Sequence, residues 1–320
     1  MRQGKRTPIF LAVLLIGVVA VTYHSYRIHR VPVAPPERLS EGYTLATGAI
    51  VREEELVDGG VDEGKIPPID EPVFESVPSA DAYLKDDGLG LALTRDGEER
   101  FYPFQLLVWH EVVNQSGKDP FVVTYSPLTG VAAAFEASTA PGTRMTFVSS
   151  GKLWNNGTVL KDRETGSLWI QAGGEAFNGS LKGTKLKLLP TEVTTWRTWK
   201  YEHPTGRVLS RETGETRDYT ENPYGDYPTS LEIFFPLTHV DPRLPAKNVV
   251  YGVARGGEAR AYPASAFTKN GEVIDAFAES SLSLTKQSDG VVLADDGTPL
   301  MRAYWFFWSV LYPNTSVYGM

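Results

Sequence analysis

The chain has 320 residues, of which 42% are hydrophobic, and it contains 7 Trp, 15 Tyr and 14 Phe. Such a composition predicts a folded protein of one large or two small domains and argues against disorder. The formal net charge of -8 argues against a nucleic-acid-binding protein, because such proteins gather Lys and Arg on one face. Because the chain has no cysteine, disulfides, thiolate metal sites and cysteine nucleophiles are excluded.

The first 30 residues have the pattern of a membrane anchor. Three basic residues precede an apolar run at 9–23, and Tyr26 and Ile28 extend it to about 20 residues, the length that a hydrocarbon core requires. A cleaved signal peptide is the alternative, but residues 24–30 contain no small-x-small cleavage site. We therefore expect residues 1–30 to form one retained transmembrane helix in the cell membrane. Because a large domain follows, we expect that domain on the extracytoplasmic side.

The composition changes after this segment. Residues 31–65 are rich in Pro and Gly, carry an acidic triplet at 53–55 and lack apolar periodicity, which predicts a flexible tether. From Ile66 onward, short apolar runs alternate with turn residues such as Asp96-Gly97, which predicts strands. We therefore predict a mainly β fold with short helices, of the β-rich α+β class. The few helix signals fall at 80–84, 194–202 and 303–311.

Two parts of the chain resemble each other. The segment GEERFYP at 97–103 recurs as GEARAYP at 257–263, with five of seven residues identical. A pair of tryptophans three residues apart also recurs, at 196–199 and at 305–308. We interpret these matches as an internal duplication, in which the second copy lacks the stretch around 126–171. The predicted boundaries are 66–215 for the first β-rich unit and 216–320 for a shorter pseudo-repeat packed on it.

The sequence HEVVN at 110–114 first suggests a zinc-protease helix, in which two histidines four residues apart face the metal. Asn114 stands in place of the second histidine, and a zinc site therefore loses its support. The chain also has no phosphate-binding loop, no dinucleotide fingerprint and no Gly-x-Ser-x-Gly elbow. We predict no metal and no cofactor. His110 is expected to be hydrogen-bonded near the core, or to line a pocket with Trp109 and Asn114.

A family resemblance rests on several motifs of the first unit. They are IPPIDEP at 66–72, YP at 102–103, WHEVVN at 109–114, VTY at 123–125, DRETGSLW at 162–169 and LP at 189–190. Together they make the chain similar to the family catalogued as domain of unknown function 3179, which is found in bacterial and archaeal proteins. That family has no established activity, so the resemblance implies no reaction.

The resemblance also shows where this chain departs from the family pattern. In that pattern, the strand that ends in Thr-Tyr continues Cys-Pro-Leu-Cys-Gly, which resembles a metal or redox site. Here the same stretch, at 126–130, has Ser126 and Thr129 in place of the two cysteines. Ser and Thr are poor ligands for soft metals and cannot form a disulfide. We therefore expect the role of the cysteine pair to be lost or altered.

The density of motifs places a candidate pocket where the inserted region folds back on Trp109. Its predicted members are Trp109, His110, Glu111, Asn114, Ser126, Thr129, Arg163, Glu164, Trp169, Gln171 and Glu175.

These observations predict a membrane-anchored, extracytoplasmic protein that acts as a binding or scaffolding module without catalysis. Its expected partners are the membrane, through the N-terminal helix, and an unknown ligand or envelope protein, with no nucleic acid. The alternative is a metal-handling or redox-derived enzyme with a pocket near His110 and the 126–130 loop. A third possibility is a solely structural envelope protein with an extended protein-contact surface.

Overall fold

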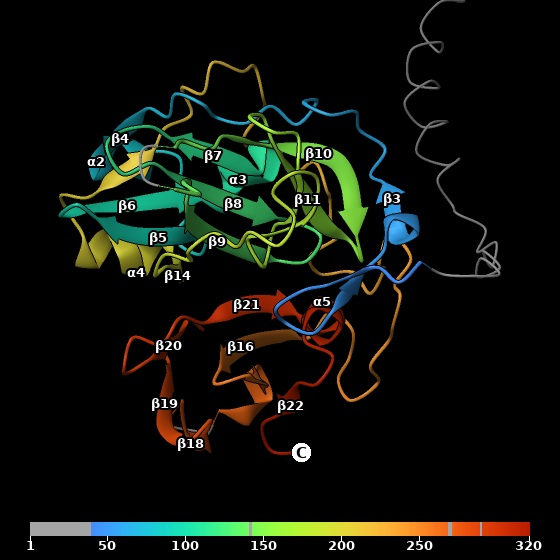
Figure 1. The fold of residues 1–320 in the computed structure, drawn as a ribbon. Coiled ribbons are helices and arrows are strands. Elements are labelled where there is room, and N and C mark those ends of the chain that lie inside the picture. The colour runs from blue at the N-terminus through green and yellow to red at the C-terminus, as the bar shows by residue number, and fades with distance from the viewer. Residues whose placement is uncertain (1–39, 141–142, 268–270, 289) are drawn as a thin grey trace, which may run out of the picture. The chain divides into compact units, whose positions relative to one another are not determined.

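The turn residues predicted from the sequence close the first long hairpin of the fold. Asp96 and Gly97 have φ values of 55° and 76°, the left-handed conformations of a tight hairpin turn. They join β5 (Leu89–Arg95) to β6 (Glu98–Pro103). The computed structural model describes residues 40–320 except 141–142, 268–270 and 289. Within these residues the fold is mainly β with four short α-helices (Figure 1).

The first large sheet has the strand order β14-β5-β6-β15-β4. Strands β14 (Glu192–Thr195) and β4 (Phe74–Ser76) run antiparallel to their neighbours, whereas β15 (Arg207–Leu209) runs parallel to β6. In this parallel pair Arg100 faces Arg207.

A second sheet, later in the chain, has the order β21-β16-β17-β22. Its strands are β16 (Val249–Arg255), β17 (Glu258–Pro263), β21 (Met301–Tyr304) and β22 (Ser316–Val317). The strand directions and the residue pairing match those of the first sheet. As β6 and β15 do in the first sheet, β17 and β22 form a parallel pair here, and β22 again follows a helix. In this pair Arg260 faces Ser316.

Each hairpin is followed by a three-stranded antiparallel sheet. The first contains β7 (Val112–Gln115), β8 (Phe121–Ser126) and β9 (Val131–Glu136), and the second contains β18 (Glu272–Phe277), β19 (Ser280–Lys286) and β20 (Val292–Ala294).

Residues 147–178 supply four strands of a five-stranded sheet of order β13-β12-β11-β10-β3. Its strands are β3 (Leu56–Asp58), β10 (Phe147–Trp154), β11 (Gly157–Asp162), β12 (Leu168–Ile170) and β13 (Glu175–Asn178). The hairpin of β11 and β12 turns at Gly166, which has a φ of 72°.

The four α-helices are α2 (Val77–Asp81), α3 (Phe104–His110), α4 (Trp196–Glu202) and α5 (Trp305–Leu311). Helices α4 and α5 lie where tryptophans three residues apart fall on one helical face, as predicted. Helix α2 begins earlier than expected. Helix α3 was not predicted, because its segment lacks the tryptophan spacing that indicates α4 and α5, and its N-cap is Pro103, which makes no side-chain capping bond.

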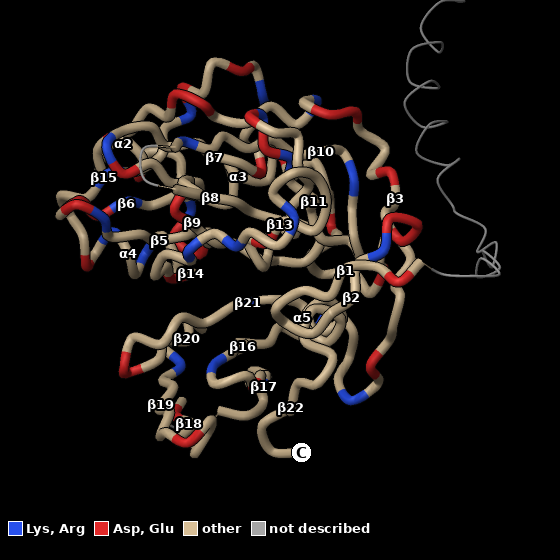
Figure 2. The backbone as a smooth tube through the Cα atoms, viewed as in Figure 1, with Lys and Arg blue, Asp and Glu red and all other residues tan. Residues whose placement is uncertain are grey.

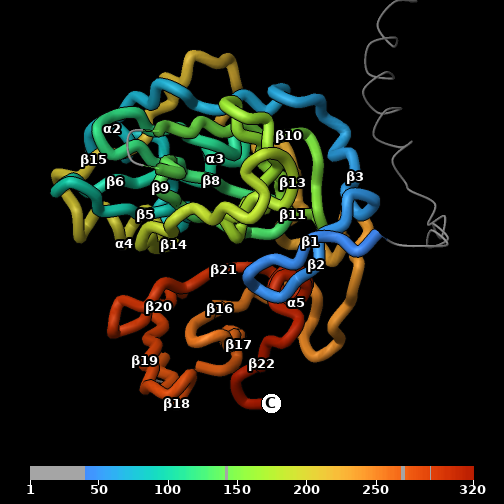
Figure 3. Tube along the Cα trace, in the orientation of Figure 1, coloured from blue at the N-terminus to red at the C-terminus, as the bar shows by residue number. Residues whose placement is uncertain are grey.

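The segment before β3 packs on the domain, which differs from the predicted flexible tether. It forms β1 (Tyr43–Thr44) and β2 (Ile50–Val51), and Leu45 and Val51 are buried in the largest core cluster. Figure 3 shows this segment beside α5. Turns separate its apolar residues so widely that they form no periodic pattern, and periodicity therefore did not predict these strands.

The predicted anchor at 1–30 lies outside the described residues. Among the residues that are described, no helix is long and apolar enough to cross a membrane. Residues Ser40–Met320 form one compact unit. Its largest core cluster joins Leu128 and Trp154 to the residues of α5. Figure 2 shows acidic and basic residues both distributed along the described chain.

Candidate functional site

Glu111, which follows α3, has an unusual backbone conformation. Its φ is 58°, a left-handed value that is uncommon for residues other than glycine. Its amide donates to the Leu107 carbonyl at 2.8 Å, which ends the helix, and its carbonyl accepts from the Tyr125 amide at 2.8 Å. These bonds fix the side chain inside the protein, where it is 3% exposed.

Hydroxyl groups surround the Glu111 carboxylate. Tyr224 donates to Oε1 at 3.1 Å and Thr158 to Oε2 at 3.2 Å, and Ser149 also bonds to it. Ser126 extends this cluster, because its Oγ accepts from the Thr158 amide at 3.2 Å and lies 3.3 Å from Thr158 Oγ1. We call Ser126, Ser149, Thr158 and Tyr224 the hydroxyl cluster.

The hydroxyl cluster contains no cation to pair with Glu111. Burial raises the pKa of the Glu111 carboxyl from 4.5 to about 7, although the hydrogen bonds from Tyr224, Ser149 and Thr158 lower it. Burial also raises the pKa of Tyr224, so this phenol remains a hydrogen-bond donor. Glu111 therefore exchanges its proton near neutral pH inside a closed polar cluster.

The 126–130 turn is packed tightly. The amides of Thr129 and Gly130 donate to the Ser126 carbonyl at 3.2 Å and 2.8 Å, and the Thr129 hydroxyl lies 3.3 Å from the same oxygen. The Thr129 carbonyl accepts from the Tyr304 amide at 2.9 Å. Both hydroxyl side chains are fully buried. The residues at the two cysteine positions of the family pattern are therefore bonded within the core.

Gln171 lies beside this cluster. Its side-chain Nε2 donates to Thr124 Oγ1 at 2.8 Å, and its backbone amide donates to the Thr158 carbonyl at 3.3 Å. Its Oε1 is buried and has no hydrogen-bond partner among the described residues.

His110 belongs to a different network. Its Nδ1 donates to the Pro67 carbonyl, which can only accept, at 2.7 Å. Its Nε2 lies 2.7 Å from the Tyr219 hydroxyl, which in turn lies 2.6 Å from Thr213 Oγ1. Burial lowers the pKa of His110, so the neutral ring accepts at Nε2 from Tyr219. The neighbouring Trp109 donates to the Glu221 carbonyl at 3.1 Å.

A third network joins Asn114 to Arg163. The Asn114 amide group bonds to both backbone polar atoms of Phe147 at 2.9 Å and donates to Asp70 at 2.8 Å. Arg163 donates to both oxygens of Asp70 at 2.8 Å and 2.9 Å. Glu164 accepts from the amide and hydroxyl of Thr146.

The last two predicted residues have separate partners. Trp169 donates to the buried Asp162 at 2.8 Å. Glu175 accepts from the Tyr43 hydroxyl at 2.8 Å and from the Ala46 amide at 3.0 Å, which holds the segment before β3. Hydrogen bonds thus bring Glu111, Ser126 and Gln171 together around Thr158, while the other predicted residues stabilise other parts of the fold.

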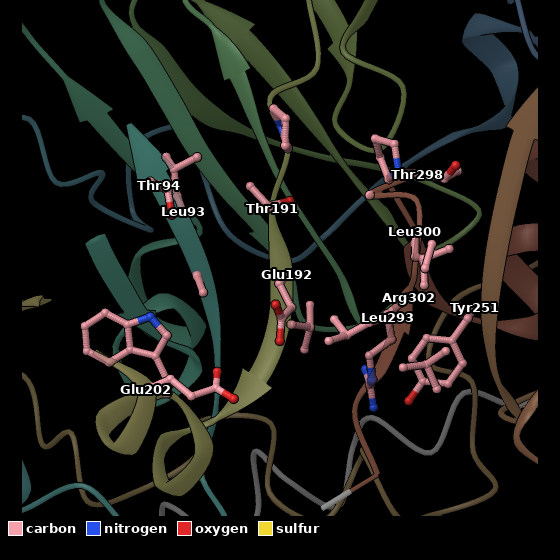
Figure 4. A pocket seen from close by; sticks show the side chains of 18 of the residues that line it. Leu93, Thr94, Thr191, Glu192, Glu202, Tyr251, Leu293, Thr298, Leu300 and Arg302 are labelled. Atoms are coloured by element: carbon pink, nitrogen blue, oxygen red, sulfur yellow. The ribbon is translucent and has the colours of Figure 1, made fainter. Parts of the chain in front are cut away.

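An open cavity of about 360 Å³ lies elsewhere, between the first and second large sheets (Figure 4). We call it the inter-sheet cleft. Its walls come from β5, β6, β14 and α4 on one side and from β16, β20 and the segment around β21 on the other. It is lined by Ala92, Leu93, Thr94, Glu99, Pro190, Thr191, Glu192, Val193, Trp199, Glu202, His203, Tyr251, Val292, Leu293, Ala294, Gly297, Thr298, Pro299, Leu300 and Arg302.

Most of the side chains in the cleft that carry a full charge are acidic. Glu99, Glu192 and Glu202 line it together with Arg302. The Nδ1 atom of His203 lies 3.7 Å from Glu99. Figure 4 shows Glu192 and Arg302 on facing parts of the wall, with apolar side chains between the strands.

A second, more open hollow has a volume of about 390 Å³. Its lining includes Arg211, Arg217 and Tyr219, the phenol that bonds to His110. Tyr219 therefore connects the His110 network to this hollow. Within the described residues, no three His, Asp or Glu side chains are grouped as metal ligands would be.

The residues of the cleft are not among those predicted from the sequence. Glu99 lies in the repeated GEERFYP segment, and Trp199 belongs to the repeated tryptophan pair. The repetition could have identified these two positions. Trp199 itself is a core residue and is 1% exposed.

Comparison with known proteins identifies the chain at the level of its family. The family described as "Protein of unknown function (DUF3179)" matches residues 63–298, which is more than half of the chain. No curated protein and no solved structure matches it. The match covers Glu111, the 126–130 turn and strands β16 and β17 of the second sheet, and it ends before β21. The chain therefore belongs to the DUF3179 family.

Proposed function

We propose that this protein is a membrane-tethered, extracytoplasmic binding module whose ligand occupies the inter-sheet cleft. One contrast carries the proposal. The cleft is an open cavity, whereas Glu111, Ser126 and Thr129 are buried and bonded to their neighbours. A ligand requires a hollow that it can reach, and the volume of the cleft is in the range of small-molecule sites.

The hydroxyl cluster favours binding over a metal-handling or redox-derived reaction. A reaction at this place would require a substrate to reach Ser126, whose side chain is fully buried. Its Oγ already accepts from the Thr158 amide. We infer that positions 126 and 129 stabilise the turn beside the cleft in this chain.

An internal duplication would explain why the two large sheets are alike. The second sheet shares strand order, strand direction and register with four strands of the first. In each sheet, a helix with two tryptophans follows the edge strand β14 or β21 and leads to a strand that runs parallel to the second hairpin strand. These similarities support a common origin for the two units.

The proposed tethering rests on the apolar run at 9–23 and its basic flank. We expect the full chain to remain with membranes after alkaline carbonate extraction. We also expect protease added outside spheroplasts to digest residues after 40. Release by carbonate, or protection from external protease, would contradict the tethering or its orientation.

The binding proposal is tested with the full chain in detergent. A fragment set containing cationic, anionic and neutral molecules is screened by ligand-detected NMR. Thr191→Trp places an indole in the cleft, and we expect it to abolish the hits. Thr229→Trp on an exposed turn is the matched control and should leave them unchanged. Hits that survive Thr191→Trp would place binding elsewhere.

A further inference from the structure

The charge of the inter-sheet cleft is unbalanced. Three carboxylates, of Glu99, Glu192 and Glu202, line it against one guanidinium, of Arg302. The excess is two negative charges when His203 is neutral and one when it is protonated. Low-dielectric walls strengthen the field of such an excess in a cleft and raise the local concentration of cations.

The single guanidinium contacts the 126–130 turn. A Cβ atom added at Gly130 would lie 3.2 Å from Arg302 Nη1 and 3.6 Å from the Tyr304 ring. The guanidinium therefore packs against the 126–130 turn. Glu99 and Glu202 belong to β6 and to the end of α4, so they come from the wall opposite to Arg302.

The apolar part of the lining is aliphatic where it is accessible. Trp199 is 1% exposed and packs against Phe101 and Trp196. Tyr251 is 9% exposed, and its hydroxyl donates to the Gly290 carbonyl at 2.9 Å. Neither ring offers the open face that stacking on a sugar, or a cation–π contact, requires.

We propose that the cleft binds an organic cation, an ammonium or guanidinium group on an aliphatic stem. The charged head pairs with Glu99 and Glu202, and the stem packs on the aliphatic side chains of the opposite wall, among them Leu293 and Leu300. This inference rests on the proposed binding function and specifies its ligand class. Both a free amine and a lysine side chain of a partner protein have this chemistry.

The experiment compares probes of one length on the full chain in detergent by titration calorimetry. The probes are 1,5-diaminopentane, 1,5-pentanediol and glutarate, which carry positive, neutral and negative ends on a five-carbon stem. We expect the diamine to bind at least tenfold more tightly than the diol, and glutarate not to bind. Raising NaCl from 50 mM to 500 mM should weaken only the diamine, because salt screens its charges.

Variants then locate the binding site. Glu99→Gln combined with Glu202→Gln should weaken the diamine at least tenfold. Glu215→Gln, which removes a carboxylate from the second hollow, is the control and should have no effect. Nα-acetyl-lysine methylamide separates the two sources of the cation. Binding as tight as that of the diamine indicates a protein side chain, and much weaker binding indicates a free amine.

The outcomes distinguish the two proposals. Equal binding of diol and diamine, tighter binding of glutarate, or an unchanged affinity in the Glu99/Glu202 double variant would overturn the cation inference. The cleft would remain a binding site if Thr191→Trp still abolished the hits of the fragment screen. If no probe or fragment responds to Thr191→Trp, the binding function itself fails. The probe comparison on the unaltered chain holds even if the double variant does not fold.

Discussion

The Tyr224 hydroxyl donates a 3.1 Å hydrogen bond to the buried Glu111 carboxylate. Tyr224 lies in the long connection at 210–248, which contains no α-helix or strand. In the same connection, Tyr219 bonds to His110, the residue before Glu111. The two successive residues His110 and Glu111, at the end of α3, therefore bind the connection between the two large sheets. Both side chains are titratable.

Glu111 should make stability depend on pH. Its pKa is about 7 in the folded protein against 4.5 in the unfolded chain, so the folded state binds more protons between these values. The free energy of unfolding should therefore fall as pH rises from about 4.5 to 7, by about 3 kcal/mol at most from 1.4 kcal/mol per pKa unit. Glu111→Gln should remove this slope, measured by urea unfolding at pH 5, 6, 7 and 8.

The comparison between variant and parent isolates this effect. His110, whose pKa burial lowers, contributes the opposite slope, since its neutral form is favoured by folding and is lost as pH falls. That slope is common to both proteins and cancels in the difference. Glu258→Gln at an exposed strand position is the matched control. A Glu111→Gln profile parallel to that of the parent would show that Glu111 does not titrate in this range.

Tyr219→Phe should loosen the connection without disturbing the hydroxyl cluster. The change leaves His110 Nε2 and Thr213 Oγ1 without their shared partner, and an unmade buried hydrogen bond costs about 1 to 3 kcal/mol. Thermal unfolding and proteolysis within 210–248 report the loss. Tyr318→Phe, whose hydroxyl makes only a 3.5 Å contact, is the control and should change little. Equal effects of the two changes would mean that the His110 bond does not hold the connection.

The sequence predicted those features that depend on local chemistry. Asp96-Gly97 gave the hairpin, and the paired tryptophans gave α4 and α5. The cleft depends on how strands distant in sequence are placed, which periodicity does not contain. Glu99 and Arg302 are about 200 residues apart in the chain and belong to different sheets, so no local pattern relates them.

The candidate residues selected from the sequence are mostly buried, but they belong to several separate hydrogen-bond networks. Every predicted residue except Trp109, Arg163 and Glu164 is buried or nearly so and makes hydrogen bonds. Motif density selects side chains that folding fixes in place. It does not distinguish a residue that holds a turn, such as Thr129, from one that faces a ligand, because both require a specific hydrogen-bonding geometry.

Asn114→Ala should destabilise the protein more than Arg163→Ala. Asn114 is 2% exposed and bonds to both backbone polar atoms of Phe147, so its removal leaves buried groups unpaired and costs about 2 to 3 kcal/mol. The Arg163 side chain is 40% exposed and its pair with Asp70 is screened by water, so its removal should cost under about 1 kcal/mol. Chemical unfolding measures both. An equal or larger loss of stability for Arg163→Ala would contradict this prediction and show that the ion pair with Asp70 contributes strongly to stability.

The seating of α5 on the second sheet depends on Gly252. A Cβ atom there would lie 2.1 Å from Trp308 Cζ3, and Trp308 is fully buried and donates to Thr315 at 2.9 Å, so it cannot move aside. Gly252→Ala should therefore cost about 1 to 3 kcal/mol of stability, the range for overpacking a core. Gly173→Ala, whose added Cβ would meet its first neighbour at 3.9 Å, is the control. Adding Trp308→Phe to Gly252→Ala should recover part of the loss, since the smaller ring vacates that space; a strictly additive double variant would mean that the two side chains do not compete.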